Sequence, residues 1–359
     1  MSQHSFLQNS TSSGPAPSVF SRRRFLGMGA AGLMAVPLLS ACGDDDSSAA
    51  PDGTALVKQI VMAPADFSVS FLDMLVTGHQ GFFAKEGINA DLQSGTGSSS
   101  ALQAIIGGVA HYTRAGRTAL PAIINEGAPL KVIGTVQHSD IWEIGSLSKK
   151  PIAEPGALRG KRIGVASEGG ATEQLVHLLA ESAGVKRDEI KLIVVGAGAA
   201  GYQFMLKGDV DGWIVHNYVR KAIEEESGEK LTVLKPEDHV RLAGSSWTMA
   251  TKTDVGDVPV RFLRALLTGM KFAADEKNRG AVFEALQKYN AEAKRKTFDE
   301  QFPAQLATWT ANQGESGMLD LVEEDWVSTV KLMHSAGMIK RIADPKEFLD
   351  RSYIDKARA

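Results

Sequence analysis

Short apolar segments that alternate with helix-forming segments constrain the fold of this chain more than any other feature. They predict strands at residues 59–62, 88–92, 131–135, 162–166, 191–195 and 212–216. Helices are expected between these strands, and Gly87 has the position of a helix C-cap after the run FFAKE. Strands and helices that alternate at this spacing form parallel or mixed sheets with helices on both faces. The predicted fold class is therefore α/β.

An internal echo suggests that the α/β part is built twice. The segment LQAIIGGVA at 102–110 resembles YQFMLKGDV at 202–210, and each is typical of a helix followed by a glycine turn and a strand. Two similar α/β lobes are the natural inference. Beyond Trp247 the pattern becomes helical, with helices predicted at 260–275, 281–289, 303–313 and 323–336 and a short last helix from Pro345.

The first 55 residues are typical of an export and anchoring segment. The run SRRRFL at 21–26 precedes a weakly apolar stretch at 26–39 and the sequence LSAC at 39–42. This order predicts a twin-arginine lipoprotein signal peptide at 1–41, cut before Cys42, which would carry a lipid. Residues 42–55 are small, polar and acidic, as in a flexible tether. The body is then expected in the periplasm or at the cell surface, anchored to the membrane by Cys42.

Composition narrows the chemistry of that body. Residues 1–41 hold three arginines and no acidic residue, so the remainder carries 36 Lys and Arg against 42 Asp and Glu. This acidic balance, without a basic block, argues against a nucleic-acid partner. Cys42 is the only cysteine, so no disulfide or thiolate chemistry is expected once it is lipidated. The eight histidines form no HxxxH or HExxH pair, and we expect neither a metal site nor a cofactor.

Four further segments carry a family resemblance. They are GFFAKEGI at 81–88, EGAPLKVI at 126–133, LRGKRIGV at 158–165 and KGDVDG at 207–212. In this order they resemble the substrate-binding proteins of ABC importers, in the group that handles sulfonates, taurine, nitrate and thiamine pyrimidine precursors. The resemblance spans roughly residues 59–218, and the helical tail fits the same plan.

The resemblance implies a two-lobed periplasmic binding protein of type II. Lobe one would comprise residues 56–147 and 245–359, and lobe two residues 148–244. Such a protein closes its lobes around a small solute and delivers it to a permease and an ATPase, without catalysis. We expect a monomer and a solute that is anionic, of sulfonate, carboxylate or nitrate type, with an aromatic group among the possibilities.

Solutes in open α/β sheets bind beyond the carboxyl ends of the strands, and this rule selects candidate residues in lobe one. They are Asp66, Phe67 and Ser68 after the first strand, and Thr96, Gly97 and Ser98 at a helix N-terminus. Free N–H groups and the helix dipole at such a terminus favour an anion. Ordinary helix capping by the hydroxyl groups is the alternative interpretation.

Arg114 and Arg117 follow a strand at 111–113, where a cleft loop is expected. A guanidinium at this place can bind a carboxylate or sulfonate through two hydrogen bonds. A structural ion pair is the alternative interpretation of each arginine.

In lobe two, the candidates are Gly169, Gly170 and Thr172 at a helix start and His216, Asn217 and Tyr218 at a strand end, as polar or stacking contacts. Trp247, like Trp142, flanks a lobe crossing and is a candidate aromatic wall for a planar solute, whereas Trp213 is assigned to the core. Glu168 lies in the same loop and would repel an anion, unless it accepts a hydrogen bond or points to water.

Two enzymatic readings compete with solute binding. GAGAAG at 196–201 is a GxGxxG motif between a strand and a helix, as in nicotinamide-dependent oxidoreductases, but no acidic residue ends the next strand. YTRAG at 112–116 resembles the arginine segment of an aromatic sulfinate desulfinase on the same fold. That enzyme needs a cysteine nucleophile, and Ser68 takes its place here, which argues against catalysis.

Overall fold

The first of two sheets holds five strands in the order β2-β1-β3-β10-β4. The computed structural model describes residues 56–359 apart from 65, 96, 167, 169, 197, 254–255 and 311–313. The strands of the first sheet are β1 (Val57–Ala63), β2 (Ile88–Ser94), β3 (Tyr112–Ala115), β4 (Leu130–Thr135) and β10 (Ser246–Ala250). β1 runs parallel to β2 and β3, whereas β10 lies antiparallel between β3 and β4.

The second sheet repeats this plan with the order β7-β6-β8-β5-β9. Its strands are β5 (Trp142–Leu147), β6 (Arg162–Val165), β7 (Lys191–Val194), β8 (Gly212–His216) and β9 (Leu231–Leu234). β6 is parallel to β7 and β8, and β5 lies antiparallel between β8 and β9. The two sheets therefore share one topology, which confirms the α/β class.

One predicted boundary is wrong. The sequence placed residues up to 147 in lobe one, but Trp142–Leu147 is strand β5 and pairs with β8 and β9 of the second sheet. Only six residues, 136–141, separate β4 from β5. This stretch is too short for a helix of the kind that separates most other strands. The sequence pattern therefore does not reveal that the chain passes into the second sheet here. Residues 136–141 and 235–245 are the two crossing segments between the sheets.

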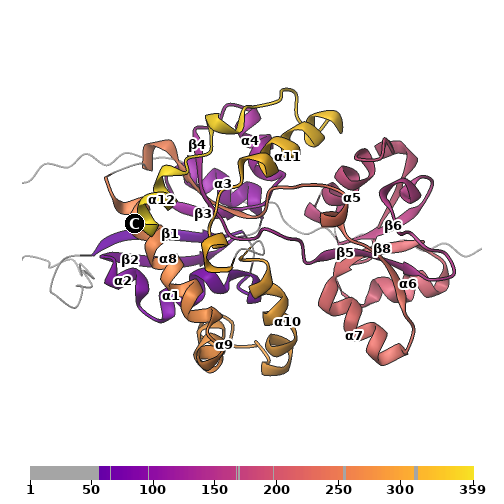
Figure 1. The fold of residues 1–359 in the computed structure, drawn as a ribbon, viewed down its shortest axis with the longest axis horizontal. Helices are drawn as coiled ribbons and strands as arrows, with labels where there is room; N and C mark the ends of the chain where they lie inside the picture. Colours follow the sequence, from indigo (N-terminus) through magenta and orange to yellow (C-terminus); the bar gives the residue numbers. More distant parts are fainter. Residues whose placement is uncertain are drawn as a thin grey trace, which may run out of the picture. The chain divides into compact units, whose positions relative to one another are not determined.

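Helices cover both sheets (Figure 1). The α-helices are α1 (Leu72–His79), α2 (Phe82–Lys85), α3 (Ser98–Ile106), α4 (Ala119–Asn125), α5 (Ala171–Glu181), α6 (Ala200–Lys207), α7 (Asn217–Ser227), α8 (Val258–Ala274), α9 (Arg279–Tyr289), α10 (Arg295–Ala307), α11 (Glu323–Ser335) and α12 (Ser352–Arg358). The 3-10 helices are η1 (Val69–Phe71), η2 (Pro155–Leu158), η3 (Arg187–Glu189), η4 (Pro236–Asp238), η5 (Thr251–Thr253), η6 (Glu276–Asn278), η7 (Gly314–Gly317) and η8 (Pro345–Glu347). None of the described helices is both long and apolar enough to cross a membrane.

The predicted helix at 303–313 is displaced in the structure. α10 runs from Arg295 to Ala307 and keeps Pro303 in its interior, although proline usually begins a helix. Phe298 and Phe302 of this helix are buried in the core, and their burial offsets the backbone hydrogen bond that Pro303 cannot donate. The expected last helix at Pro345 is the single turn η8, and α12 follows it.

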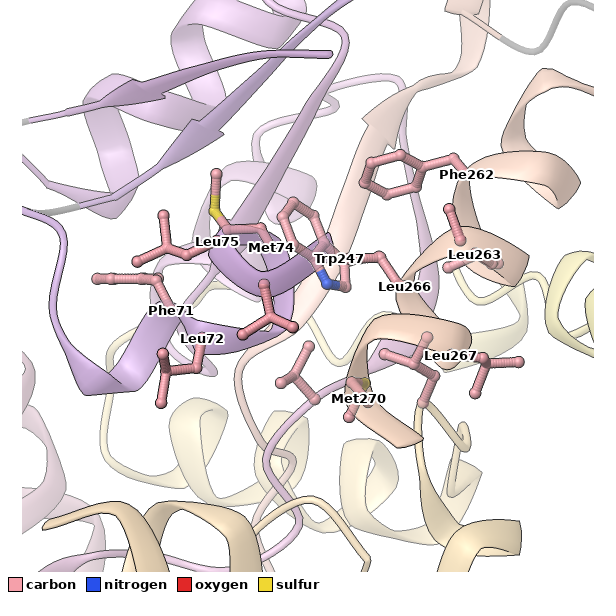
Figure 2. Close-up of a cluster of buried hydrophobic side chains, with 14 of the residues drawn as sticks. Phe71, Leu72, Met74, Leu75, Trp247, Phe262, Leu263, Leu266, Leu267 and Met270 are labelled. Atoms are coloured by element: carbon pink, nitrogen blue, oxygen red, sulfur yellow. The ribbon is translucent and has the colours of Figure 1, made fainter. Parts of the chain in front are cut away.

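The core of lobe one forms around Trp247, which is fully buried between side chains of α1 and α8 (Figure 2). The two helices approach closely because a Cβ atom at Gly269 would lie 2.0 Å from the Thr77 hydroxyl oxygen, so only glycine fits there. α12 also packs on α8. Lobe one is thus a rigid support for the loops that follow its strands.

Candidate functional site

The candidate site comprises the segments that follow the parallel strands of both sheets. After β1, Asp66 is exposed, and Phe67 contacts the Tyr289 ring edge-on, with 5.5 Å between centroids. Ser68 is extended and precedes η1, and its side chain caps no helix. Of these three predicted residues, Ser68 has a hydroxyl group without a capping role.

Arg114 at the end of β3 is an anchor inside lobe one. Its side chain is 2% exposed, and Nη1 donates to the Ser70 carbonyl and, over 2.9 Å, to Asp73 Oδ1. Nε donates to Ser245 Oγ over 3.3 Å. The other Asp73 oxygen accepts from Trp247 Nε1 over 3.0 Å. The structure thus favours the alternative reading of Arg114, a buried ion pair, over solute binding.

Trp247 does not form an aromatic wall, because its side chain is fully buried. It lies opposite Arg114 in the register of β10 and β3, and its indole serves the Asp73 network. Asp73, the second residue of α1, was not among the predicted site residues. A carboxylate on an apolar helix face, in LDMLV, was the available signal.

Arg117 is also paired. Its two terminal nitrogens bind both oxygens of Asp140 in the first crossing segment, over 2.6 and 2.8 Å. The Asp140 backbone N–H donates to Glu237 Oε2 of the second crossing segment over 3.3 Å. Burial, and to a lesser extent the nearby Asp140 charge, raises the pKa of Glu237. Arg117 therefore belongs to a polar link between the crossing segments.

Glycine residues occupy the N-cap positions of α3 and α5. α3 begins after Gly97 and α5 after Gly170, and neither residue has a side chain that could bind the first-turn N–H groups. Ser98 instead accepts from the Gly116 N–H over 3.3 Å, and Thr172 accepts from the Ala166 N–H over 3.0 Å. These two hydroxyl groups thus tie neighbouring loops together.

On lobe two, His216 lies in a row of three rings. Its imidazole is 3.8 Å from the Trp142 ring and 4.9 Å from the Tyr218 ring, between centroids, and the Tyr218 hydroxyl hydrogen-bonds Nδ1. Burial lowers the pKa of His216 to about 4 and raises the pKa of Tyr218 to about 12. All three rings are therefore uncharged near neutral pH.

The first crossing segment has a cavity on each side. One, of about 590 Å³, is lined by His138–Ile141, by α7 and by α10, and it includes Asn217, whose Oδ1 is shielded without a partner among the described residues. The other, of about 470 Å³, is lined by Arg117, by both crossing segments and by Asp325 of α11. Both cavities are lined by His138, Ser139, Asp140 and Glu237, so the crossing segments form a wall common to the two.

Other candidates have different outcomes. Glu168 is exposed, as the alternative reading held. Gly201 of the GxGxxG motif meets the Trp213 indole, where a Cβ would lie 2.2 Å from Cδ1, so helix packing explains that glycine. No group of three or more His, Cys, Asp or Glu that could hold a metal occurs in the described part of the chain. Cys42, Thr96 and Gly169 lie outside the described residues.

Comparison with known proteins identifies the family of this chain. A family model described as NMT1/THI5 like matches residues 68–279, more than half of the chain. The chain belongs to the NMT1/THI5-like family. No curated protein matches its sequence significantly.

Several solved structures share the fold of this NMT1/THI5-like chain. The aliphatic sulphonate binding protein SsuA from Escherichia coli is 14% identical with a TM-score of 0.60, over 81% of this chain and 96% of that one. The alkanesulfonate-binding protein SsuA from Xanthomonas axonopodis pv. citri, bound to MOPS, is 14% identical with a TM-score of 0.58, over 83% and 100%. The nitrate-binding protein NrtA from Synechocystis PCC 6803 is 10% identical with a TM-score of 0.55, over 84% and 88%. At these identities the likeness establishes the periplasmic binding protein fold of type II.

Proposed function

We propose that this chain is the extracytoplasmic solute-binding component of an ABC importer. It captures a small solute between its two lobes and delivers it to a permease and an ATPase. Support comes from the family, from the fold shared with sulfonate- and nitrate-binding proteins, and from the glycine N-caps of α3 and α5. The glycine N-caps of α3 and α5, one in each lobe, let a solute approach the backbone of the helix starts closely and are the observation that carries the proposal.

These termini also suggest how an anionic head group is held. Sulfonate, carboxylate and nitrate oxygens accept hydrogen bonds from backbone N–H groups at a helix start, where the dipole favours negative charge. Arg114 and Arg117 already neutralise Asp73 and Asp140, so neither guanidinium needs a solute. Donors therefore come from the first turns after Gly97 and Gly170, with the Ser68 hydroxyl beside them.

Capture follows from differential affinity rather than from chemistry. A solute that touches both lobes binds the closed form more tightly than the open form, and this difference shifts the population toward closure. The two crossing segments, with space on each side at 138–140, serve as the hinge. In this proposal the lipid on Cys42 holds a monomeric receptor near its permease.

Calorimetric titration of residues 43–359 tests the proposal. The panel contains taurine, ethanesulfonate, nitrate and benzoate, and ethanolamine as a cationic control without an oxyanion. We expect one of the four oxyanion-bearing solutes to bind at micromolar or tighter Kd, to be recovered intact, and ethanolamine not to bind. Turnover of a bound solute would show that the protein is an exported enzyme and not a receptor.

A further inference from the structure

The buried apolar side chains of the two lobes are joined on one side of the crossing segments and separate on the other. One cluster contains residues of lobe one alone, among them those of α1, α8 and α10, and another contains residues of lobe two alone. A third cluster holds buried side chains of α11 in lobe one together with those of α5 in lobe two. α11 and α5 are in contact within this shared core (Figure 1).

α11 belongs to lobe one through its contact with η8. The rings of Trp326 on α11 and Phe348 after η8 meet edge-on, with 5.6 Å between their centroids. The Phe348 carbonyl in turn accepts a hydrogen bond from the Val132 N–H of β4 over 2.8 Å. α11 is therefore fixed to the first sheet.

The same helix is also attached to lobe two. Ser335, the last residue of α11, donates to Oε1 of Glu181, the last residue of α5, over 2.5 Å. Val330 and Met333 of α11 and Leu178 of α5 are buried members of the shared cluster. Separating the two helices would expose apolar surface to water, and the free-energy cost rises with the area exposed. The contact between α11 and α5 therefore resists separation.

The second crossing segment is fastened to α11 as well. The Ala243 N–H donates to the buried Thr329 Oγ1 over 2.7 Å, and Arg241 Nε donates to Asp325. The end of this covalent crossing and the noncovalent contact with α5 thus depend on one helix.

On the α10 side, the lobes approach each other without a shared core. α7 of lobe two contacts α10 of lobe one, but the buried residues of the two helices fall in separate clusters. Tyr218 and Gln301 line a narrow gap here, and the cavity of about 590 Å³ adjoins it, since Ile141 and Ala304 line both. Among the described residues, no hydrogen bond or ion pair joins α7 to α10.

We propose that the lobes pivot about the contact between α11 and α5, and that the cleft opens and closes at the edge between α7 and α10. α11 is then a third, noncovalent connection between the lobes beside the two crossing segments. A close-packed shared core moves as a unit, whereas helices with separate cores and a cavity beside them can approach and part. The proposal rests on the proposed function for one consequence, which is that solute exchange takes place on the side of α7 and α10.

Two cysteine pairs test the proposal in residues 43–359, which contain no other cysteine. The pivot pair is Glu181→Cys with Ser335→Cys, and the edge pair is Tyr218→Cys with Gln301→Cys. Each pair is bridged by a short bifunctional thiol reagent, and the unbridged double variant is the matched control. Small-angle X-ray scattering measures the radius of gyration without solute. Stopped-flow mixing measures the association rate of the member of the oxyanion panel that binds.

We expect the pivot bridge to leave the radius of gyration and the association rate unchanged. The edge bridge should lower the radius of gyration and slow association about tenfold or more, because the solute then finds the cleft held closed. A pivot bridge that changes either quantity, or an edge bridge that changes neither, overturns the pivot.

The scattering arm keeps the two proposals distinct. If no panel member binds, the proposed function fails, and a radius of gyration lowered by the edge bridge alone still supports the pivot, whereas any other pattern overturns it. Circular dichroism of the unbridged variants checks their folding. If the edge pair does not fold, Lys221→Cys with Glu300→Cys, at exposed positions of α7 and α10, takes its place.

Discussion

Each lobe buries an arginine behind the cleft, but the two arginines have different surroundings. In lobe one, Arg114 faces one carboxylate, Asp73, and both are 2% exposed or less. In lobe two, Arg220 faces Glu143 and Glu224, and all three residues are 5–9% exposed. The first network pairs one arginine with one carboxylate, whereas the second places two carboxylates on Arg220, and one of them, Glu224, also lies 3.9 Å from the exposed Lys230.

The difference teaches how to read a cleft-side arginine. A guanidinium whose hydrogen bonds are used inside the lobe fixes a loop, and its charge is not available to a solute. The one-to-one network has no spare partner, so any change in it leaves a buried charge uncompensated. The network with two carboxylates has a reserve, and it should tolerate the loss of one.

The largest expected effect is that of Arg114→Met. This change leaves Asp73 buried without its partner, and we expect it to lower the free energy of unfolding by about 3–5 kcal/mol, measured by urea denaturation. The double variant Arg114→Met, Asp73→Leu should recover part of the loss. If Arg114→Met keeps its stability but loses affinity for an oxyanion, Arg114 contacts the solute after all.

A smaller effect is expected in acid, from His216. The unfolded chain takes up this proton below its ordinary pKa of about 6.5, whereas the folded protein takes it up only near pH 4. The contribution to stability is therefore complete above pH 6.5 and is lost as the pH falls from 6.5 to 4, with a total of roughly 3 kcal/mol.

Denaturation at a series of pH values measures this loss, and His216→Asn should flatten the profile in that window. The same change at His79, which is exposed on α1, serves as the control. Other buried histidines, among them His177, also have pKa values lowered by burial, so the difference between variants isolates His216. A His216→Asn profile identical to that of the parent would contradict the assignment.

The smallest effect is expected from Glu224→Gln. Arg220 retains Glu143, and the glutamine oxygen can still accept from the Leu231 N–H, which Glu224 Oε1 does over 2.8 Å. We expect a loss of about 1 kcal/mol or less in the free energy of unfolding. The corresponding change in lobe one, Asp73→Asn, should cost clearly more. Equal losses would erase the distinction between the two networks.

Much of the fold follows from local pattern. The parallel strands and the helices α8, α9 and α11 have clear apolar periodicity, and the resemblance between 102–110 and 202–210 corresponds to matching positions before β3 and β8. The antiparallel strands β5 and β10 were not identified, because they follow crossing segments rather than helices. Strand β9, which follows α7, was not identified either. The interior proline of α10 shows tertiary burial of Phe298 and Phe302 prevailing over a local preference.

The candidate site was less predictable. Loop positions such as Ser68 and Gly170 follow from the rule on strand ends, but the partners of Arg114 and Arg117 are 41 and 23 residues away in sequence. No local sequence pattern reveals whether a carboxylate so far away in sequence pairs with a given arginine. Trp142, His216 and Tyr218 were each noted from the sequence, but the contact between Trp142 and His216 depends on the pairing of β5 with β8.

The place of β10 has a consequence for how the chain folds. This strand lies inside the first sheet, between β3 and β4, yet it follows β4 only after the whole second sheet. Until it arrives, β3 and β4 present unpaired edges, and exposed edges invite pairing with other chains. Completion of lobe one must therefore wait for the synthesis of lobe two, and such non-local pairing is slow. A ribosome-bound chain that ends before residue 246 should be prone to aggregation, whereas the finished chain closes its own gap.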